Sequence, residues 1–269
     1  MNGLQNIGNT CYLNSALQFL FNIDSIIYLI INTSNTYPNF NMLKNFILEY
    51  KNNNNKVLNP VKIKDLISLY QKNFIGFNQN DSSEFLIYLL DFINDNTDKK
   101  LNNCIGIQIN IDIKCKRMAC LKSNNHFENE KFLFLDLNDN LDNSYRQYKS
   151  NEILKDDNEY SCEHCNKKSI ARRKTQINKW PKDLIIILKR FDNKLRKLNN
   201  DIDIPFNWRH NYELKGFILH SGGLSSGHYV YYGEKDSNWY LFNDSSINII
   251  NNIKEILKKS YILHYKLKT

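Results

Sequence analysis

The first hundred residues carry apolar side chains at helical spacing. After Thr10, apolar residues recur every three or four positions through Phe21, and the same spacing returns over 43–50 and 63–70. The tetrapeptide Asp81-Ser82-Ser83-Glu84 has the form of a capping box and precedes another run of this kind. The pattern predicts a helical lobe over residues 1 to about 103.

From residue 105 the apolar period changes to two. The segments IGIQINIDIKC and FLFLDL alternate strictly, which is typical of half-buried strands. LIIILKRF, at 184–191, is a continuous apolar run that favours a fully buried strand. Further strands are expected at HYVYYG, WYLFND and SYILHYKL, and a short helix over 145–154. Without an internal repeat or a linker rich in Pro or Gly, the chain is expected to form one α+β domain over 1–269.

The composition fits a folded protein, since 42% of the 269 residues are hydrophobic and 13% are aromatic. A formal net charge of +8 brings nucleic-acid binding into consideration. However, the basic residues are scattered, and the tightest cluster (Lys167, Lys168, Arg172, Arg173 and Lys174) is expected to be a solvated strand or loop face. We therefore expect no nucleic-acid partner.

No secretory signal is expected, because Met1 is followed directly by polar residues. The apolar stretch 16–31 is interrupted by Asn22, Asp24 and Ser25, which argues against a bilayer span. Six cysteines without a secretory signal favour thiolate or metal chemistry over disulfides. We expect a cytoplasmic or nuclear protein with no membrane partner.

One cysteine lies in a polar, turn-forming stretch. GLQNIGNTCYLNSALQ, at 3–18, places Cys11 at the start of a helix, where the helix dipole and unpaired backbone N–H groups are expected to lower the pKa of its thiol. The alternative is a small residue of the core. A nucleophilic cysteine also needs a histidine and a polar group that orients it.

Such partners occur near the end of the chain. His228 begins the strand HYVYYG, and Asn243 and Asp244 end the strand WYLFND. An antiparallel hairpin would bring these ends together, so that an amide or carboxylate could accept from the imidazole and leave its other nitrogen facing Cys11. Taken alone, His228 could be an ordinary strand histidine.

Four further cysteines form two pairs. Cys162 and Cys165 make a CxxC turn, and Cys115 and Cys120 make a wider CxxxxC. Four thiolates would form a closed tetrahedral structural site for Zn²⁺, the alternative being two pairs without metal. No thioredoxin-like βαβ pattern surrounds the CxxC, which argues against a redox role. Cys104 is expected to be a plain buried thiol.

Several motifs resemble those of one family. GLQNIGNTCYLNSALQ resembles the cysteine box of the ubiquitin-specific proteases, which are papain-like cysteine deubiquitinases. GFNQNDSSEFLIYLL resembles their glutamine-aspartate-glutamate box, and YELKGFILHSGGLSSGHYVYYG their histidine box. YSCEHCNKKSIARRKTQINKWPKDLIIILKRF, WYLFNDSSI and SYILHYKL also resemble family segments, in family order. The resemblance covers essentially the whole chain.

The resemblance implies a fold with three regions. These are a helical thumb over about 1–103, fingers with zinc knuckles and a connecting helix over 104–178, and a β-rich palm over 179–269. The implied cofactor is structural zinc on Cys115, Cys120, Cys162 and Cys165, with none for catalysis.

Individual roles are carried over from the matching motif positions. The resemblance implies that Cys11 is the nucleophile, His228 its general base and Asn243 the third catalytic residue. Asp244 matches a position that assists or substitutes for the third residue. Asn6 matches the side-chain donor of the oxyanion hole.

The resemblance also implies a channel for the ubiquitin C-terminal tail. Gln79 matches a glutamine beside the active site, and Asp81 and Glu84 match the acids that hold the arginines of the tail. Gly227 and Tyr229 are expected to line the channel, with the loop 222–227 as a mobile cover. The alternative is that Asp81 and Glu84 only cap a helix.

The implied activity is that of a deubiquitinating thiol isopeptidase, which hydrolyses the bond after the last glycine of ubiquitin. Ubiquitin and its conjugates are the expected partners of a monomer. Two alternatives remain within this resemblance: a protease for a ubiquitin-like modifier, and a ubiquitin-binding scaffold without turnover. From the residues alone, a basic zinc protein that binds nucleic acid is a third, although no recognition helix is evident.

Overall fold

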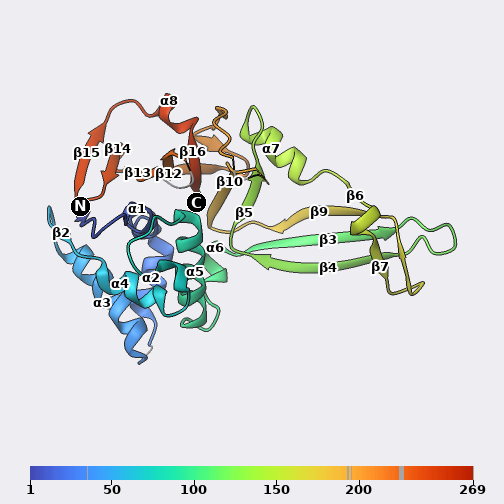
Figure 1. Cartoon of the computed structure of the whole chain (residues 1–269), viewed down its shortest axis with the longest axis horizontal. Coiled ribbons are helices and arrows are strands. Elements are labelled where there is room, and N and C mark those ends of the chain that lie inside the picture. Colours follow the sequence, from blue (N-terminus) through green and yellow to red (C-terminus); the bar gives the residue numbers. More distant parts are fainter. Residues whose placement is uncertain (35, 193, 195, 224–226, 269) are drawn as a thin grey trace.

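The computed structural model describes residues 1–269 except 35, 193, 195, 224–226 and 269. Its helical lobe is built around α1 (Cys11–Phe21), all of whose residues are buried. Figure 1 shows α1 between the other helices and strand β13. The remaining helices of the lobe are α2 (Asp24–Asn32), α3 (Pro38–Asn52), α4 (Val61–Ser68), the 3₁₀ turn η1 (Lys72–Phe74), α5 (Ser82–Asp95) and α6 (Asn102–Ile105).

Helices therefore occupy all four segments of this lobe in which the sequence predicts them. The sequence analysis missed α2, whose apolar residues were treated only as a possible membrane span. Within the described residues, no single helix has the length and apolar composition needed to cross a bilayer; α1 and α2 would pass only if counted together, and 84° separates their axes.

An eight-stranded sheet packs against α1 on the side opposite the other helices. Its order is β15-β14-β13-β12-β16-β10-β5, with β11 paired to β12. Only the β10–β5 pair is parallel. The strands are β5 (Leu133–Asp136), β10 (Asp183–Lys189), β11 (Asn207–Trp208), β12 (Tyr212–Gly222), β13 (Gly227–Lys235), β14 (Asn238–Asn243), β15 (Ser246–Ile250) and β16 (Ser260–Leu267), and α8 (Lys254–Leu257) precedes the last strand.

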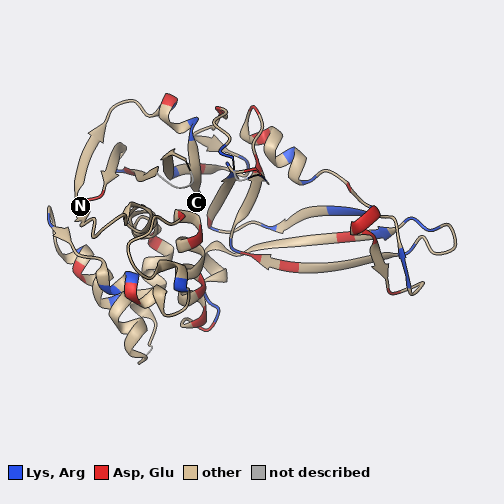
Figure 2. Cartoon of the chain, in the orientation of Figure 1, with Lys and Arg blue, Asp and Glu red and all other residues tan. Residues whose placement is uncertain are grey.

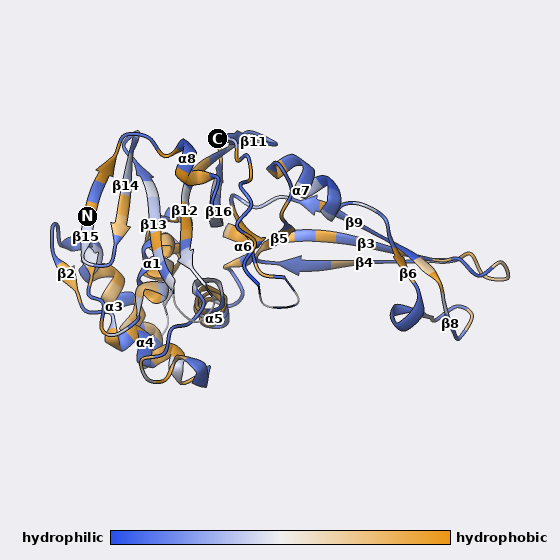
Figure 3. Cartoon of the chain, turned by 45° about the horizontal axis from the view of Figure 1, so that its top comes forward, coloured by the Kyte–Doolittle hydropathy of each residue, from blue (hydrophilic) through white to orange (hydrophobic). Residues whose placement is uncertain are grey.

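A four-stranded sheet of order β4-β3-β9-β6 extends from the central sheet, and we call it the arm. Strand β4 is hydrophilic along most of its length, whereas β3 is apolar near the central sheet (Figure 3). The strands β7 and β8 form a separate hairpin toward the tip. The bounds are β3 (Ile107–Cys115), β4 (Ser123–Glu130), α7 (Leu141–Tyr148), β6 (Glu152–Leu154), the 3₁₀ turn η2 (Asp156–Asn158), β7 (Tyr160–Cys162), β8 (Lys167–Ser169) and β9 (Ala171–Lys179).

The structure corrects one predicted element and adds others, among them β4, β12 and β15. The helix expected over 145–154 is wrong: α7 ends at Tyr148, and 152–154 form β6, because Glu152 pairs with Arg173 of β9. Strand β4 was missed because SNNHFENE has no apolar alternation, and it pairs with β3 alone. The expected strands over IGIQINIDIKC, FLFLDL, LIIILKRF and the three later segments are present.

Two short strands fasten the chain start to the rest of the molecule. Strand β1 (Gly3–Leu4) runs parallel to β2 (Val57–Leu58). On its other side, the backbone N–H of Leu4 donates to the carbonyl of Asp244, at 2.9 Å. A Cβ on Gly3 would lie 2.3 Å from the carbonyl oxygen of Ser245, so only glycine permits this close approach. The segment before Cys11 is therefore fixed against the turn that follows β14.

Candidate functional site

The thiol of Cys11 lies at the first residue of α1 and is 4% exposed. The backbone N–H of Tyr229, the residue after His228, donates to it. Burial is the largest influence on this group and raises the pKa of the Cys11 thiol, and the carboxylate of Asp244 acts in the same direction. The expectation of a lowered pKa is therefore wrong for the chain alone, because desolvation outweighs the favourable helix start.

His228 and Asn243 form a hydrogen-bonded pair. The hairpin of β13 and β14 brings them together, and the imidazole Nε2 lies 2.7 Å from Asn243 Oδ1. Because a carbonyl oxygen only accepts, Nε2 carries the proton and Nδ1 is left as the basic nitrogen. The predicted hairpin is confirmed.

Among the described residues, the imidazole of His228 makes no hydrogen bond with the Cys11 thiol, although the backbone of its neighbour Tyr229 does. Hydrogen bonds of this kind often become short only when substrate is bound. Cys11 is thus hydrogen-bonded to the neighbour of His228 but not to His228 itself.

Asn6 has a fixed amide orientation in the loop before Cys11. Its Oδ1 accepts from the backbone N–H groups of Gly8 and Thr10, at 3.1 and 3.2 Å. The opposite end of the amide, Nδ2, donates to Asp244 Oδ2 at 2.8 Å. An amide nitrogen carries two hydrogens, so within the described part of the chain one N–H of Asn6 has no acceptor and can bind another group.

Asn14, which the sequence analysis left without a role, holds the other oxygen of Asp244. Its side chain is 1% exposed and donates from Nδ2 to Asp244 Oδ1 at 2.7 Å and to the carbonyl of Gln5 at 3.2 Å. Asp244 therefore bridges Asn14 and Asn6. The available signal was a polar residue about one turn after Cys11, although Ser15 and Gln18 are polar residues of the same helix.

Asn9, also without an assigned role, shapes the same loop. It adopts a left-handed conformation (φ 53°) and donates from Nδ2 to the carbonyl of Phe77 at 2.8 Å. Gly8 has φ 110°, and a Cβ there would lie 2.7 Å from the Phe77 ring. These contacts join the loop before Cys11 to the segment that precedes α5.

A cavity of about 440 Å³ contains four of the five residues assigned to the tail channel. Gln79, Asp81, Glu84 and Tyr229 line it. The fifth, Gly227, donates its backbone N–H to Gln79 Oε1 at 2.7 Å. The loop 222–227 that was expected to cover the channel includes 224–226, which lie outside the described residues.

Asp81 is the N-cap of α5, as the sequence predicts. Its carboxylate accepts from the backbone N–H groups of Ser83 and Glu84. It also accepts from the hydroxyls of Ser83, Tyr229 and Tyr261, at 2.5 to 3.0 Å. Five donors occupy its lone pairs. By contrast, within the described residues the carboxylate of Glu84 accepts no hydrogen bond and lines the cavity.

Four other residues that line this cavity were given no role from the sequence. They are Asn80, Phe191, His220 and Tyr261. His220 lies opposite Tyr229 in the β12–β13 pair, and their rings stack at 4.3 Å. Burial lowers the pKa of His220 to about 4, so it is neutral at neutral pH. The position of His220 opposite Tyr229 could have been predicted from the sequence if the length of the turn between β12 and β13 had been known.

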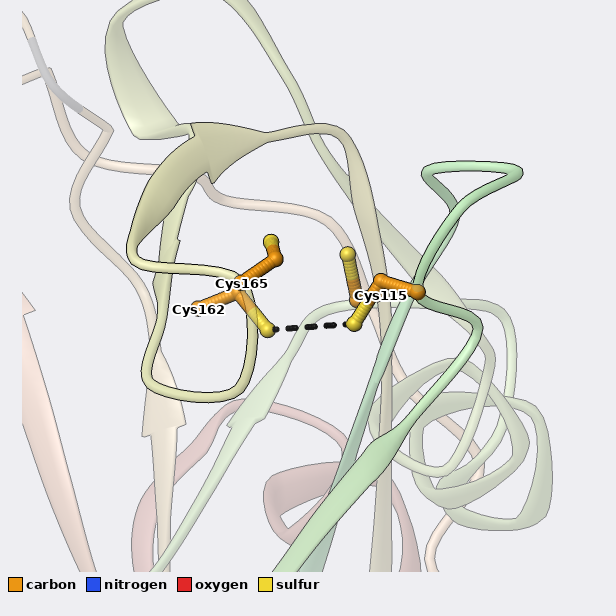
Figure 4. A group of neighbouring side chains, drawn as sticks. Cys115, Cys162 and Cys165 are labelled. Carbon is orange, nitrogen blue, oxygen red and sulfur yellow. Dashed lines mark hydrogen bonds between the residues drawn. The ribbon is translucent and has the colours of Figure 1, made fainter.

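The four paired cysteines meet at the tip of the arm. The sulfur atoms of Cys115, Cys120, Cys162 and Cys165 all lie within 4.8 Å of one another. Side chains from the two loops face each other in Figure 4, where the dashed line marks the 3.7 Å between the sulfurs of Cys120 and Cys162. A tetrahedral Zn²⁺ with Zn–S bonds of about 2.3 Å needs S···S distances of about 3.8 Å. The donor set and its spacing fit zinc.

The wide CxxxxC spacing is absorbed by a tight turn. Backbone N–H groups of Cys120 and Leu121 both donate to the carbonyl of Arg117, and Leu121 adopts φ 49°. The hydroxyl of Ser169 lies 3.1 Å from the sulfur of Cys115. Cys104 is not part of the cluster; it is half-buried and its thiol lies 3.6 Å from the carbonyl of Ser25.

Comparisons with known proteins point to one family. Residues 2–265 match the model of the family described as ubiquitin carboxyl-terminal hydrolase. The chain is 28% identical to ubiquitin carboxyl-terminal hydrolase 36 of Drosophila grimshawi, over 98% of this chain and 25% of that protein. It is 28% identical to hydrolase 25 of Arabidopsis thaliana and 25% identical to hydrolase 2 of Bos taurus, again over 98% of this chain but only 47% and 55% of those proteins.

The chain thus spans between a quarter and about half the length of these relatives. The family match, by contrast, extends over nearly the whole chain and includes every residue of the candidate site. The chain belongs to the ubiquitin carboxyl-terminal hydrolase family of hydrolases.

Proposed function

We propose that this chain is a thiol isopeptidase that hydrolyses the bond after the C-terminal glycine of ubiquitin. One observation carries the proposal: the pairs His228–Asn243 and Asn6–Asp244 flank a single thiol next to the cavity that contains Glu84. A base, an oxyanion donor and a nucleophile therefore converge beside a channel for an extended peptide.

Cys11 is the proposed nucleophile and His228 its base. As substrate binds, Nδ1 of His228 takes the thiol proton and the sulfur attacks the carbonyl carbon of the last glycine. When the C–N bond breaks, the imidazolium returns the proton to the departing lysine amine. Water activated by the same imidazole then hydrolyses the thioester. Asn243 keeps the proton on Nε2 throughout and so presents Nδ1 to the thiol.

The oxyanion is assigned to the free N–H of Asn6 and the backbone N–H of Cys11. A preorganised amide donor of this kind lowers the barrier by about 3–4 kcal/mol. Asp244 acts here as a positioning residue rather than a base: one oxygen holds Asn6, while Asn14 holds the other. This arrangement leaves the third place of the triad to Asn243.

The tail of ubiquitin is assigned to the cavity beside Cys11. Because the carboxylate of Asp81 already has five donors, Glu84 is the better placed partner for an arginine of the tail. Asp81 instead fixes the hydroxyls of Tyr229 and Tyr261. A larger residue in place of Gly227 would crowd this site, because its Cβ would lie 2.1 Å from Nε2 of His220.

The three regions expected from the resemblance are proposed as functional units. The helical lobe would be the thumb, the central sheet the palm, and the arm the fingers. A second cavity, of about 580 Å³, lies where the arm meets the sheet and is lined by Glu128, Glu130, Asp136 and Glu152 among others. We call the face of the arm that it occupies the inner face, and this acidic surface would contact the body of ubiquitin.

Zinc is the proposed cofactor, held by Cys115, Cys120, Cys162 and Cys165. Its chemistry there would be structural, because four thiolate ligands leave no position for water or substrate. The protein contributes the turn that presents Cys120 and the hydroxyl of Ser169 beside Cys115. Holding the two loops together would keep the tip of the arm folded.

The test is hydrolysis of a fluorogenic C-terminal amide of ubiquitin by the chain and by Cys11→Ala, together with labelling by an electrophilic ubiquitin probe. We expect turnover and labelling only with the thiol present. Equal rates for both proteins would overturn the proposal. Tight ubiquitin binding without a covalent adduct would instead indicate a scaffold. Parallel amides of ubiquitin-like modifiers ending in Gly-Gly would show whether one of these is preferred.

A further inference from the structure

A cavity on the opposite face of the arm has no place in the mechanism above. It has a volume of about 490 Å³ and lies where α7 and the segment before β12 meet the arm. Asn110 of β3 and Gln176 of β9 line it, and these residues are cross-strand neighbours. Side chains alternate between the two faces of a strand, so this outer cavity and the acidic inner one lie on different faces. The outer cavity is also lined by Tyr145, Lys149, Trp180 and Arg209.

The outer cavity carries an excess of positive charge. The Lys149 ammonium lies 4.8 Å from the centre of the Tyr145 ring, and the Arg209 guanidinium lies 4.6 Å from the same centre. Asp142 pairs with Arg209 at 2.8 Å. Within the described part of the chain, Lys149 has no carboxylate partner, and no acidic residue lines the cavity. An added anion would supply the partner that Lys149 lacks and add a second one to Arg209.

The same face stays basic toward the tip. Lys114 and Arg172 are cross-strand neighbours on it, as are Asp112 and Lys174. Three cations and one carboxylate therefore follow the strands outward from the cavity. Figure 2 shows blue basic segments on β9 and red acidic segments on β4. The basic cluster of the sequence is thus divided, because Arg173, between Arg172 and Lys174, points to the inner face and pairs with Glu152 at 3.5 Å.

The aromatic wall of the cavity is closely packed. The Trp180 ring lies 5.6 Å from Tyr145, 5.0 Å from His210, 5.9 Å from Tyr212 and 6.2 Å from Trp208. A ring with four such neighbours forms a rigid apolar wall but does not offer an open face for stacking with a base. This favours a peptide over a nucleic acid as the occupant.

One buried polar atom indicates that the occupant also donates hydrogen bonds. Oδ1 of Asn110 is buried, and no group among the described residues donates to it. An unpaired buried acceptor is costly, and a backbone N–H entering the cavity would satisfy it. A peptide that carries carboxylates supplies both kinds of partner, whereas inorganic anions supply only one.

We propose that the outer face of the arm binds an acidic peptide segment of a partner protein. Carboxylates of the segment pair with Lys149 and Arg209 in the cavity, and a backbone N–H bonds to Asn110. Further acidic residues extend along Lys174 and Arg172 toward the tip. The site is separate from the candidate active site, so a partner bound there leaves the tail channel open.

The experiment measures binding of a short fluorescent peptide, in which glutamate alternates with glycine and leucine, to the full chain by anisotropy. Controls are the same peptide with glutamine in place of glutamate, and a single-stranded oligonucleotide of equal charge. The decisive variant is Lys149→Glu. Its matched control is Lys62→Glu, which makes the same change in net charge at an exposed position of α4, in the helical lobe.

We expect the glutamate peptide to bind, Lys149→Glu to weaken binding by about tenfold or more, and Lys62→Glu to leave it nearly unchanged. Asn110→Leu, which removes the acceptor without changing charge, should weaken binding by a smaller factor. Unchanged thermal unfolding and ubiquitin-amide hydrolysis in Lys149→Glu would show that the fold is intact. No binding by the glutamate peptide, equal binding to Lys149→Glu, or stronger binding of the oligonucleotide would each overturn the proposal.

Discussion

The molecule contains two kinds of cysteine site, and their surroundings differ in every respect. Cys11 is a single thiol at a helix start, enclosed by polar side chains of distant segments. The arm holds four thiols close together. Among the described residues, this cluster includes no carboxylate or imidazole that would activate one of the thiols. Burial raises the pKa of Cys11, whereas a hydrogen bond from Ser169 lowers the pKa of Cys115.

The difference shows that the surroundings of a cysteine decide whether its thiol suits nucleophilic attack or metal binding. A lone thiol beside an imidazole can be deprotonated on demand and attack a carbonyl. Four thiols within bonding distance of one point repel each other once ionised, and a divalent cation removes that repulsion. Isolation favours a nucleophile, and clustering favours a metal ligand.

The strongest test of this contrast exchanges single cysteines. Cys11→Ala should lower hydrolysis of the ubiquitin amide by at least about 10⁴-fold, because no other group replaces the nucleophile. Its metal content and thermal unfolding should match those of the unchanged chain. Cys104→Ala, which alters a half-buried thiol outside both sites, is the control and should keep its activity. Residual turnover in Cys11→Ala would mean that the nucleophile lies elsewhere.

The second test changes the cysteine cluster of the arm and leaves Cys11 in place. The double variant Cys162→Ser/Cys165→Ser should lose bound zinc, since apparent binding energies of structural zinc are about 10 kcal/mol or more and depend on all ligands. Elemental analysis should fall from one zinc per chain to a trace. Limited proteolysis should then cut between 115 and 169. Labelling of Cys11 should persist, and if it disappears together with zinc, the two sites are not independent.

A finer test concerns the polar enclosure of Cys11. Asn14→Ala and Asp244→Ala should each lower kcat by about 10- to 100-fold, with KM changing less, because both act on Asn6, the proposed oxyanion donor. If Asn14 acts through Asp244, the double variant should be no slower than Asp244→Ala. If the loss in kcat of the double variant equals the product of the two single losses, the two residues act separately.

The smallest expected effect is a shift along the pH axis. Because burial and Asp244 raise the pKa of Cys11, its alkylation by iodoacetamide should increase with pH beyond the range of an ordinary thiol. Asp244→Asn removes the negative charge, so the profile should move to lower pH. A profile unaffected by this change would contradict an electrostatic influence of Asp244 on the thiol.

Local patterns determined how much could be predicted from the sequence. The helices around Cys11 and the strands around His228 have clear periodicity, and the hairpin that joins His228 to Asn243 followed from it. The contacts of Asn14 and Asn9 could not be predicted, because both depend on how distant segments pack. The same holds for β6, which has only three residues, and for β4, whose sequence is polar; both become strands by pairing with neighbours. The lowered pKa expected for Cys11 failed because burial is a tertiary property.

The alternation along β9 also bears on which genetic changes the arm can tolerate. Arg172 and Lys174 belong to one surface and Arg173 to the other, so each surface can change by point substitution without disturbing its opposite. Inserting or deleting a single codon before Arg172 would instead exchange the two sets, moving every following side chain to the wrong face. Lineages of this protein should therefore change the charges on one face of β9 independently of the other face, while keeping the length of the strand constant.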